Sequence, residues 1–303
     1  MASIDWRYFD GMTHRLNRWL LVVMVLIAAP FWWLLIDNSP GQAQPKPIHI
    51  AELRRLAATL PGSRPTALHY TIVATRRTVG DLFAAGIGLK RRSLAMIAWY
   101  LPVPGAGPIL IDAAATPADA QASGFRHFDI VKQHQIDTDA ARADLILATH
   151  LPPNQGGAQP TAYHPLGKTP DPAPPSRGTL TAAAGAAPVA APRAVAPGVV
   201  VIPASDYAPG AQLIFVQLAA GAEFLFTGDI SNLDDNWSQL RARSLLAAHW
   251  LAPQTRAKVY PWLRTIRQLH CEAPKLTIVP GNDVTWLIKQ RHNGKVAELN
   301  PGQ

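Results

Sequence analysis

The chain has 303 residues, 48% of them apolar, so it is long and apolar enough to bury a core, and a wholly disordered chain is excluded. Its formal charge is +8, but the basic residues are scattered, with tight groups at Arg76-Arg77 and Lys90-Arg91-Arg92. Neither group is interleaved with aromatic residues, so both indicate a solvated rim, and no nucleic-acid partner is expected. Cys271 is the sole cysteine, which excludes an intrachain disulfide and a metal cage built from cysteines.

The first predicted element is a membrane-spanning helix. Trp19–Ile36 is a run of 18 residues without a charge. A helix of that length spans about 27 Å, close to the hydrocarbon thickness of a bilayer. Trp19 at one end and Trp32-Trp33 towards the other resemble interfacial anchors, and Pro30 is expected to kink the helix, which lipid tolerates. The sequence therefore predicts a single crossing of the lipid bilayer.

The charges that flank this helix predict its orientation. Three arginines precede it, whereas the first charged residues after it are Asp37 and the more distant Lys46. The positive-inside rule then places segment 1–18 in the cytoplasm and the main domain outside, which for a bacterial inner membrane is the periplasm. The alternative is a cleaved signal peptide with a small-residue site at Gly41-Gln42-Ala43, but 18 bulky residues with three Trp are long for its apolar region. The three arginines are Arg7, Arg15 and Arg18.

A tether, a helix and a main domain are expected next. Ser39–Pro47 is rich in proline and is expected to be a tether, and His49–Leu60 has the apolar spacing of an amphipathic helix. Residues 37–65 are assigned to these two elements, and residues 66–303 to the main domain.

The main domain is predicted to contain two groups of strands with helices between and after them. The strands are short β-rich runs: Ala67–Thr75, Leu94–Leu101, Pro108–Asp112, Ala143–Ala148, Val199–Pro203, Gln212–Gln217, Glu223–Thr227 and Leu276–Pro280. The helices are Pro117–Ser123, Ser238–Leu251, Thr255–Cys271 and Val284–Arg291. This order predicts an α+β fold in which two packed sheets are covered outside by helices, an αββα sandwich.

Residues 152–198 interrupt this pattern. They contain 11 prolines and 12 alanines in 47 positions, with almost no hydrophobic periodicity. Such a composition predicts an irregular insertion. It could be a lid over a site or a partner-binding arm, but its low hydrophobicity favours a mobile segment.

Five short motifs follow one another along the main domain. They are ILID at 109–112, DLILATH at 144–150 with Gly156-Gly157 after it, VVVIPASDYAPGAQLIFV at 199–216, EFLFTGD at 223–229 and LTIVPGND at 276–283. Their order resembles the metallo-β-lactamase-fold hydrolases from about residue 66 to residue 290. The resemblance implies the αββα sandwich of that family and a loop that carries its zinc ligands.

The resemblance also implies which positions correspond to the metal ligands. The family's His-x-His-x-Asp-His loop aligns on Thr149-His150, its third histidine on the residue two before Pro209-Gly210, its bridging aspartate on the Thr-Gly-Asp motif and its last histidine on the Pro-Gly-Asn motif. The corresponding residues are His150, Pro152, Asn154, Gln155, Tyr207, Asp229 and Asn282. Only His150 and Asp229 keep the residue type of a ligand, so this chain departs from the family at five of seven positions.

These replacements are poor donors for zinc. Zinc is bound by imidazole nitrogen and carboxylate oxygen, and it lowers the pKa of a bound water to about 7, which makes that water a nucleophile. Proline has no lone pair to offer, and amides offer a neutral oxygen. A structural zinc site contributes about 10–16 kcal/mol, on the order of 3–4 kcal/mol for each of four ligands. With two ligands left, neither zinc nor another cofactor is expected.

A buried polar cluster is the expected replacement for the metals. Amide and hydroxyl groups can fill a metal-sized space while they hydrogen-bond one another, and buried polar groups must be paired. We therefore expect His150 and Asp229 to persist as partners in this cluster. Taken singly, His150 is more often a strand-end histidine satisfied by the backbone, and Gly228-Asp229 is more often a capped turn. Their place in the family order favours remnants of a site.

The other candidate motifs favour ordinary structural roles. Gly86-Ile87-Gly88 opens like a dinucleotide fingerprint but lacks the third glycine and a preceding strand. His127 and His134 lie near three aspartates without ligand spacing and are expected at the surface. Four tryptophans in the C-terminal part are expected in the core, with an exposed docking face as the alternative: Trp237, Trp250, Trp262 and Trp286.

Two functional hypotheses follow. The favoured one is a membrane-anchored, non-catalytic protein that uses a hydrolase fold for binding or scaffolding, as an accessory subunit beside other membrane protein subunits. The alternative is a hydrolase with a reduced or relocated site, in which Asp229, His150 or Tyr207 serves as an acid or base.

Overall fold

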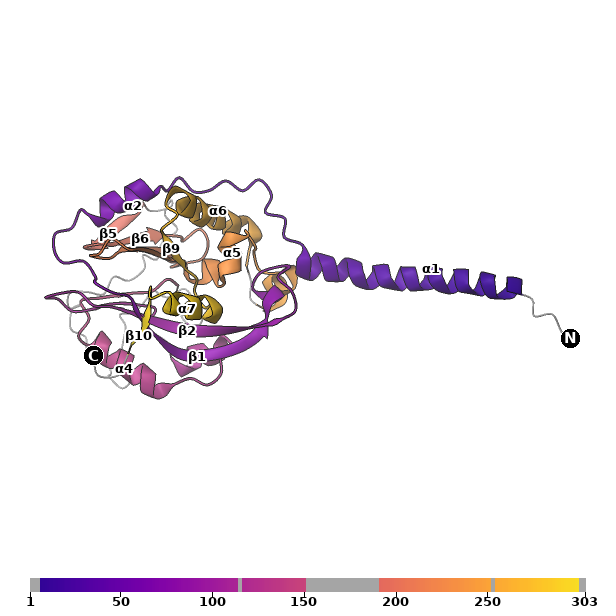
Figure 1. Ribbon diagram of the computed structural model, residues 1–303, viewed down its shortest axis with the longest axis horizontal. Coiled ribbons are helices and arrows are strands. Elements are labelled where there is room, and N and C mark those ends of the chain that lie inside the picture. Colours follow the sequence, from indigo (N-terminus) through magenta and orange to yellow (C-terminus); the bar gives the residue numbers. More distant parts are fainter. Residues whose placement is uncertain (1–5, 114–115, 151–190, 252–253, 300–303) are drawn as a thin grey trace.

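The computed structural model describes residues 6–113, 116–150, 191–251 and 254–299, and it consists of one long helix that projects from a layered domain (Figure 1). The helix α1 (Trp6–Phe31) continues into a π-helical turn, η1 (Trp32–Ile36). Within it, His14–Ile36 is long and apolar enough to cross a membrane. The predicted apolar helix is therefore confirmed, although a signal sequence would meet the same criterion. The π-helical turn follows Pro30, whose ring provides no N–H for the α-helical ladder.

The two residues after η1 bind the helix to the domain. The carboxylate of Asp37 accepts a hydrogen bond from Arg256 (3.2 Å), and the Asp37 carbonyl accepts a second one from the same guanidinium (2.6 Å). Asn38 uses both ends of its amide on three groups: the carbonyl of Leu240 (2.9 Å), the N–H of Ala242 (3.1 Å) and the hydroxyl of Tyr260 (2.7 Å). We call these six residues the junction.

The segment expected to be a tether lies along the domain surface. It passes over α6 (Arg256–Glu272) on its way to α2 (Ile50–Ala57), which lies within the predicted amphipathic helix (Figure 1). The backbone N–H of Lys46 donates to the Thr265 hydroxyl (2.7 Å), and the Lys46 ammonium pairs with Asp206 (2.5 Å). Residues 37–48 therefore hold the domain close to the end of the apolar helix.

The first sheet has the strand order β10-β1-β2-β3-β4. β1 and β2 form a long antiparallel hairpin, and β3 and β4 run parallel to each other. The bounds are His69–Val79 for β1, Arg91–Leu101 for β2, Ile109–Ile111 for β3, Leu145–Leu147 for β4 and Ala297–Glu298 for β10.

The second sheet has the order β5-β6-β7-β8-β9, with β8 and β9 parallel and the other pairs antiparallel. The bounds are Arg193–Ala196 for β5, Val199–Pro203 for β6, Gln212–Gln217 for β7, Glu223–Phe226 for β8 and Thr277–Val279 for β9. β5 falls in the predicted irregular insertion, whose residues 152–190 otherwise lie outside the described part of the chain.

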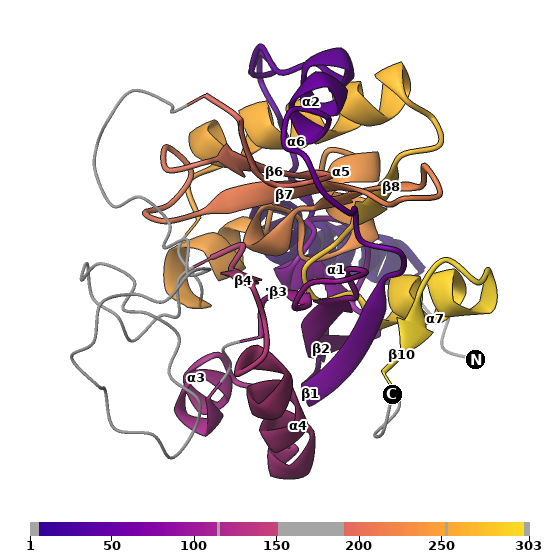
Figure 2. The same cartoon turned by 90° about the vertical axis from the view of Figure 1, so that its left-hand side faces the viewer.

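The two sheets pack face to face with helices outside them (Figure 2). The core between the sheets includes Trp99, which contacts Phe226 and Trp286 edge to face at 5.4 and 6.4 Å between ring centres. A second core lies between the other face of the second sheet and helices α2 and α6, and a third joins the first sheet to α4 (Ile130–Ala140). The predicted αββα layering is confirmed.

The remaining helices show where the predicted elements failed. Ser238–Leu251 is not one helix: α5 (Asp234–Ser238) ends early, and a π-helical turn, η4, covers Ala247–Leu251. Leu240 adopts a left-handed backbone (φ 52°), and Asn236 binds the backbone of Arg241, so the chain leaves the helix between them. Apolar spacing could not reveal this interruption. The helix α4 was missed, whereas α3 (Pro117–Ala122), α6 and α7 (Val284–His292) match their predictions within two residues.

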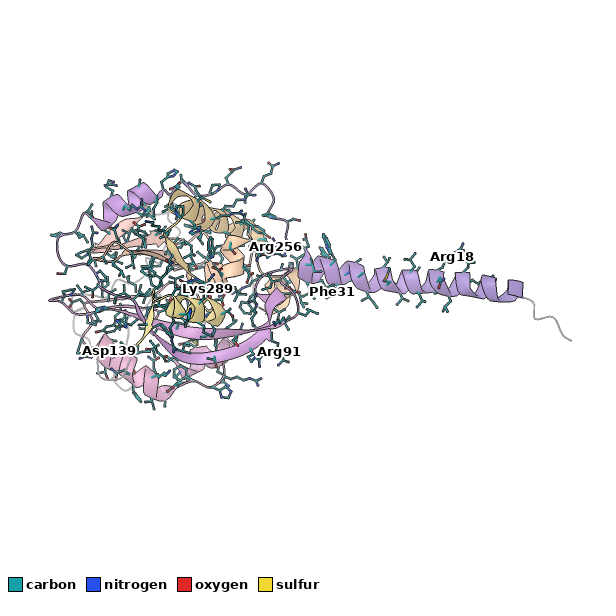
Figure 3. All side chains as sticks on the ribbon, viewed as in Figure 1. Arg18, Phe31, Arg91, Asp139, Arg256 and Lys289 are labelled. Atoms are coloured by element: carbon teal, nitrogen blue, oxygen red, sulfur yellow. The ribbon has the colours of Figure 1, made fainter. Side chains whose placement is uncertain are left out.

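Most of the histidines and tryptophans that were predicted at the surface or in the core lie where they were expected. Figure 3 draws the described side chains on the ribbon. His127 and His134 are exposed, as predicted. Trp262 and Trp286 are buried and Trp237 is half-buried, so core packing is confirmed for the first two. The side chain of Trp250 lies outside the described part of the structure.

Candidate functional site

A cavity of about 590 Å³ lies at one end of the sandwich, where strands from both sheets run out. β3 and β4 pair in parallel through Ile111 and Leu147, and β8 and β9 pair in parallel through Phe226 and Val279. Parallel strands end at the same edge of a sheet, so the four loops that follow them meet there. The cavity is lined from these loops by Asp112, Thr149, His150, Gly228, Asp229, Gly281 and Asn282.

Two glycines allow these loops to touch. A Cβ on Gly228 would lie 2.4 Å from the Thr149 hydroxyl oxygen, and Gly228 has φ +50°, a conformation that L side chains rarely adopt. A Cβ on Gly281 would lie 2.5 Å from the carbonyl oxygen of Gly228. The Thr-Gly-Asp motif therefore needs glycine because its backbone lies against the Thr149 side chain, and the Pro-Gly-Asn motif needs it because its backbone lies against that of Gly228.

The first wall of the cavity is fixed by Asp112 and Thr149. One carboxylate oxygen of Asp112 accepts a hydrogen bond from the Thr149 N–H (2.7 Å), and the other accepts one from the Thr149 hydroxyl (2.8 Å). Asp112 has a left-handed backbone (φ 54°), which is uncommon outside glycine and concentrates at functional sites. Burial raises the pKa of the Asp112 carboxyl above its usual range.

A set of hydrogen bonds connects the third and fourth loops, which follow β8 and β9. Both protons of the Asn232 amide are used, one on Asp229 (2.8 Å) and one on Asn282 (2.8 Å), and its oxygen accepts from Arg243 (3.0 Å). The Asn282 amide also donates to the carbonyl of Ala95 (2.9 Å). We call Asp229, Asn232, Asn282 and Arg243 the amide cluster. The amides in it are bound to protein groups on both sides.

His150 lines the cavity together with Asp229, but its hydrogen bond joins its Nδ1 to the Thr149 hydroxyl (3.2 Å). Asp229 is bound to Asn232 instead. The two are coupled through their charges. Burial lowers the pKa of His150, but the carboxylates of Asp229 and Asp112 outweigh it and the pKa is raised. Burial raises the pKa of Asp229, but His150 and Arg243 outweigh it and the pKa is lowered.

Tyr207 takes no part in the cavity wall that is described. Its hydroxyl donates to the backbone carbonyl of Asp229 (3.1 Å) and accepts from Gln254 (3.3 Å). Burial and the charge of Asp229 raise its pKa, so the phenol stays neutral. At this position a phenol therefore supports the Asp229 backbone from behind.

Two arginines line the cavity and were not predicted. The guanidinium of Arg76 lies over the rings of Phe83 (4.7 Å) and Phe125 (5.1 Å), and that of Arg243 lies over Phe83 from 5.4 Å. Burial and the neighbouring Arg243 lower the pKa of Arg76. Both cations act on Asp229 and hold its pKa down. The cavity thus carries cationic side chains where the resemblance implies a metal cation.

Of the seven positions that the resemblance marks, the structure brings His150, Asp229 and Asn282 into one cavity and places Tyr207 behind it. Pro152, Asn154 and Gln155 lie outside the described residues. Asp112, Thr149, Asn232, Arg76 and Arg243 were missed. Asp112 could have been found because an aspartate directly follows a short apolar strand; no spacing indicates Arg76 or Arg243, which come from other parts of the chain.

These donors do not fit a zinc ion. The Asn282 amide is committed to two protein groups, the Tyr207 hydroxyl binds a carbonyl, and the charges of two guanidinium groups favour the ionised form of Asp229. Among the described residues, no three His, Cys, Asp or Glu side chains are arranged so that they could hold a metal ion. The negative charge of Asp229 is balanced by arginine side chains of the chain itself, in the role that a metal ion would have in a metal site.

No protein-family model and no curated protein matches this sequence. Similar folds are found among solved structures. An N-acyl homoserine lactone hydrolase with N-hexanoyl-L-homoserine at its catalytic metal centre has 12% identity and a TM-score of 0.51 over 75% of this chain and 96% of that chain. A quorum-quenching N-acyl homoserine lactone lactonase has 13% identity and a TM-score of 0.52 over 78% and 98%.

A mutant of the B. thuringiensis protein AiiA with bound N-decanoyl-L-homoserine has 13% identity and a TM-score of 0.51 over 75% of this chain and 96% of that chain. At such identities the similarity concerns the fold alone. Together with the two sheets and the converging loops, it shows that this chain has a metallo-β-lactamase-like fold.

Proposed function

We propose that this protein is a membrane-anchored, non-catalytic member of the metallo-β-lactamase-like fold that serves for binding or scaffolding, as an accessory subunit of a membrane protein complex. The observation that carries the proposal is the amide cluster. Asn232 binds Asp229, Asn282 and Arg243 at once, so side chains at two of the ligand positions are held by protein partners. Such a cluster is stable without a metal, because its buried polar groups are paired.

Charge supports the same proposal. His150, Arg243 and Arg76 all favour the ionised form of Asp229 and together supply the positive charge that a metal site would draw from the ion. A divalent cation entering the cavity would be repelled by these cations. Zinc binding at Asp229 and Asn282 would also compete with the hydrogen bonds of the amide cluster.

The junction supports a retained anchor over a cleaved signal peptide. Cleavage at Gly41-Gln42-Ala43 would remove Asp37 and Asn38 and leave the buried Tyr260 hydroxyl and the Arg256 guanidinium without these partners. Removing one partner of a buried polar pair costs about 1–3 kcal/mol. We propose an inner-membrane location with a cytoplasmic N-terminus and a periplasmic domain, on the strength of Arg15 and Arg18 before the apolar stretch.

The test uses the full chain purified in mild detergent. After incubation with ZnCl₂ and removal of free metal, we expect far less than one zinc ion per chain. We expect no metal-dependent hydrolysis in an esterase, lactamase and thioesterase panel that also includes an N-acyl homoserine lactone. Stoichiometric zinc together with metal-dependent turnover would contradict the proposal. Purification from native membranes should also bring partner subunits with the protein.

A hydrolase with a reduced site is the second candidate. It is favoured by one observation: His150, whose pKa is raised, lies in an open cavity with Asp229 and Asp112 and could serve as a general acid. If so, Asp229→Ala abolishes turnover at unchanged expression, whereas a binding protein loses only stability. Asn293→Ala, at an exposed asparagine, is the matched control for both readouts.

A further inference from the structure

The tip of the β1–β2 hairpin lies beside the end of the apolar helix. After β1, a 3₁₀ turn, η2 (Gly80–Leu82), packs against η1, and the N–H of Gly86 donates to the carbonyl of Leu35 (3.1 Å). We call residues 88–92 the hairpin tip. Figure 3 shows Arg91, within it, at the end of the domain from which α1 leaves. The hairpin tip is therefore fixed at the level where the apolar stretch ends.

The side chains of the hairpin tip combine an exposed apolar residue with cations. Leu89 is 56% exposed, and Lys90 and Arg91 are exposed as well. Arg92 pairs with Asp235 (3.3 Å), whereas Lys90 and Arg91 have no ion-pair partner among the residues that the structure describes. An exposed apolar side chain followed by two cations without an ion-pair partner suits the boundary between lipid headgroups and acyl chains.

The backbone keeps this tip in shape. The N–H of Gly80 donates to the Lys90 carbonyl (3.1 Å), and Asp81 binds the backbone of Gly88 through both its N–H and its carboxylate. The carboxylate of Asp81 is buried in this role, so it does not neutralise the cations at the surface. The hairpin tip is thus presented in a fixed position.

Chain length limits how far the tip can lie from the end of the apolar helix. Leu89 is three residues beyond Gly86, which is hydrogen-bonded to Leu35, so at about 3.5 Å per residue it lies within roughly 15 Å of Leu35. The headgroup layer on each side of a bilayer is about 5–8 Å thick. If the apolar stretch ending at Ile36 fills the hydrocarbon core, residues 88–91 lie close enough to its end for their side chains to extend to the headgroup layer.

We propose that the hairpin tip is a lipid-binding surface, on which Leu89 enters the interface and Lys90 and Arg91 bind anionic phospholipid headgroups. The inference rests on the retained anchor proposed above, and it is independent of whether the cavity is catalytic. It assigns a role to a basic group that the sequence marked only as a solvated rim. Together with the junction, this contact would fix the domain's orientation on the membrane.

Depth is tested with single fluorescent labels on the full chain. In a Cys271→Ser background, an environment-sensitive dye is attached at Leu89→Cys, and nanodiscs are made from phosphatidylcholine mixed with phosphatidylglycerol. We expect this label to be quenched by lipid-borne quenchers and shielded from aqueous iodide. Val131→Cys, on α4 and 75% exposed, is the matched control and should be fully accessible to iodide. Arg91→Cys gives a second reporter if the first variant is unstable.

A label at Val25→Cys, on the exposed apolar helix, separates the two proposals. Lipid quenching at Val25 together with iodide access at Leu89 equal to that at Val131 would overturn the hairpin proposal and leave the anchor intact. No lipid quenching at Val25 would overturn both.

The charge requirement is tested by titrating phosphatidylglycerol into the nanodiscs. Each basic residue near an anionic surface contributes roughly fivefold to affinity, so the Lys90→Gln, Arg91→Gln variant should need roughly 25-fold more phosphatidylglycerol for the same dye response. The control removes two exposed cations that lie near the end of α6 far from the junction, Arg267→Gln and Lys275→Gln, and should leave the response unchanged. Equal responses of both double variants would overturn the role of headgroup charge.

Discussion

The amide cluster and the junction both depend on the hydrogen bonds of one asparagine amide, but they join different parts of the molecule. In each, one asparagine uses both ends of its amide on three partners, Asn232 in the amide cluster and Asn38 in the junction. In each, an arginine stands beside an aspartate, Arg243 near Asp229 and Arg256 on Asp37. The amide cluster joins loops of one sandwich, whereas the junction joins the apolar helix to that sandwich.

The two sets meet in one stretch of chain. Asn38 holds the backbone of Leu240 and Ala242, and the next residue, Arg243, reaches into the cavity. Arg256 binds Asp37 and also the carbonyl of Arg243 (3.3 Å). The anchor therefore helps to position a side chain of the cavity wall. Loops at the end of the sandwich can be held in shape by such contacts.

The largest effect is expected where the site loops touch through glycine. Gly228→Ala adds a Cβ 2.4 Å from the Thr149 hydroxyl oxygen in a left-handed conformation, and overpacking together with backbone strain should destabilise the protein by about 2–5 kcal/mol. The control Gly221→Ala has a left-handed φ of +84° but nothing within 4 Å of its Cβ, so about 1–2 kcal/mol is expected. Unfolding of the full chain in detergent, followed by tryptophan fluorescence, measures both. Equal losses would show that the Gly228 backbone does not lie against the Thr149 side chain.

The next effect tests the amide cluster itself. Asn232→Ala leaves Asp229, Asn282 and Arg243 without a shared partner, and we expect a loss of about 2–4 kcal/mol, because unsatisfied buried polar groups cost about 1–3 kcal/mol each and part of this is recovered by water. Asn293→Ala should change stability by less than about 0.5 kcal/mol. A loss for Asn232→Ala no larger than that of its control would mean that the cluster contributes nothing to the fold.

The outcome of the sequence predictions follows from the physics of each element. β6 and β7 were predicted with their bounds because apolar runs such as Val199–Pro203 are bounded by residues that end a strand. The prediction of one helix over Ser238–Leu251 failed because two asparagine side chains bind the backbone where the helix is interrupted. Asn38, which is distant in sequence, binds Ala242, and Asn236 binds Arg241. The same limit hid Arg243: no spacing in a sequence shows which cation will balance a buried aspartate.

The junction is expected to contribute less than the amide cluster, because it lies nearer to solvent. Asn38→Ala removes the partners of Leu240, Ala242 and Tyr260, and we expect a loss of about 1–3 kcal/mol. Amide exchange at Ala242 should become faster, since its N–H donates to the Asn38 side chain. Gln42→Ala, at an exposed residue outside the junction, is the control. If Ala242 exchanges as slowly in the variant as in the wild type, the junction does not position the chain before Arg243.

The smallest effect is a pH dependence at the far end of α6. The Glu272 carboxylate accepts hydrogen bonds from the N–H of Ile50 (2.9 Å) and from Gln268 (2.7 Å) and pairs with His49 (2.8 Å), so it holds α2 to α6. Burial acts to raise its pKa, but these hydrogen bonds outweigh burial and the pKa is lowered below its ordinary value of 4.5. A carboxyl whose pKa is depressed by folding stabilises the folded state above pH 4.5, and this contribution is lost as the pH falls through the folded pKa.

Because the group is partly exposed, Glu272→Gln should cost only a few tenths of a kcal/mol at neutral pH. Melting temperatures of wild type and variant should therefore differ slightly at pH 7 and converge in acid, and a difference that persists below the folded pKa would show that the carboxylate charge is not what joins the two helices.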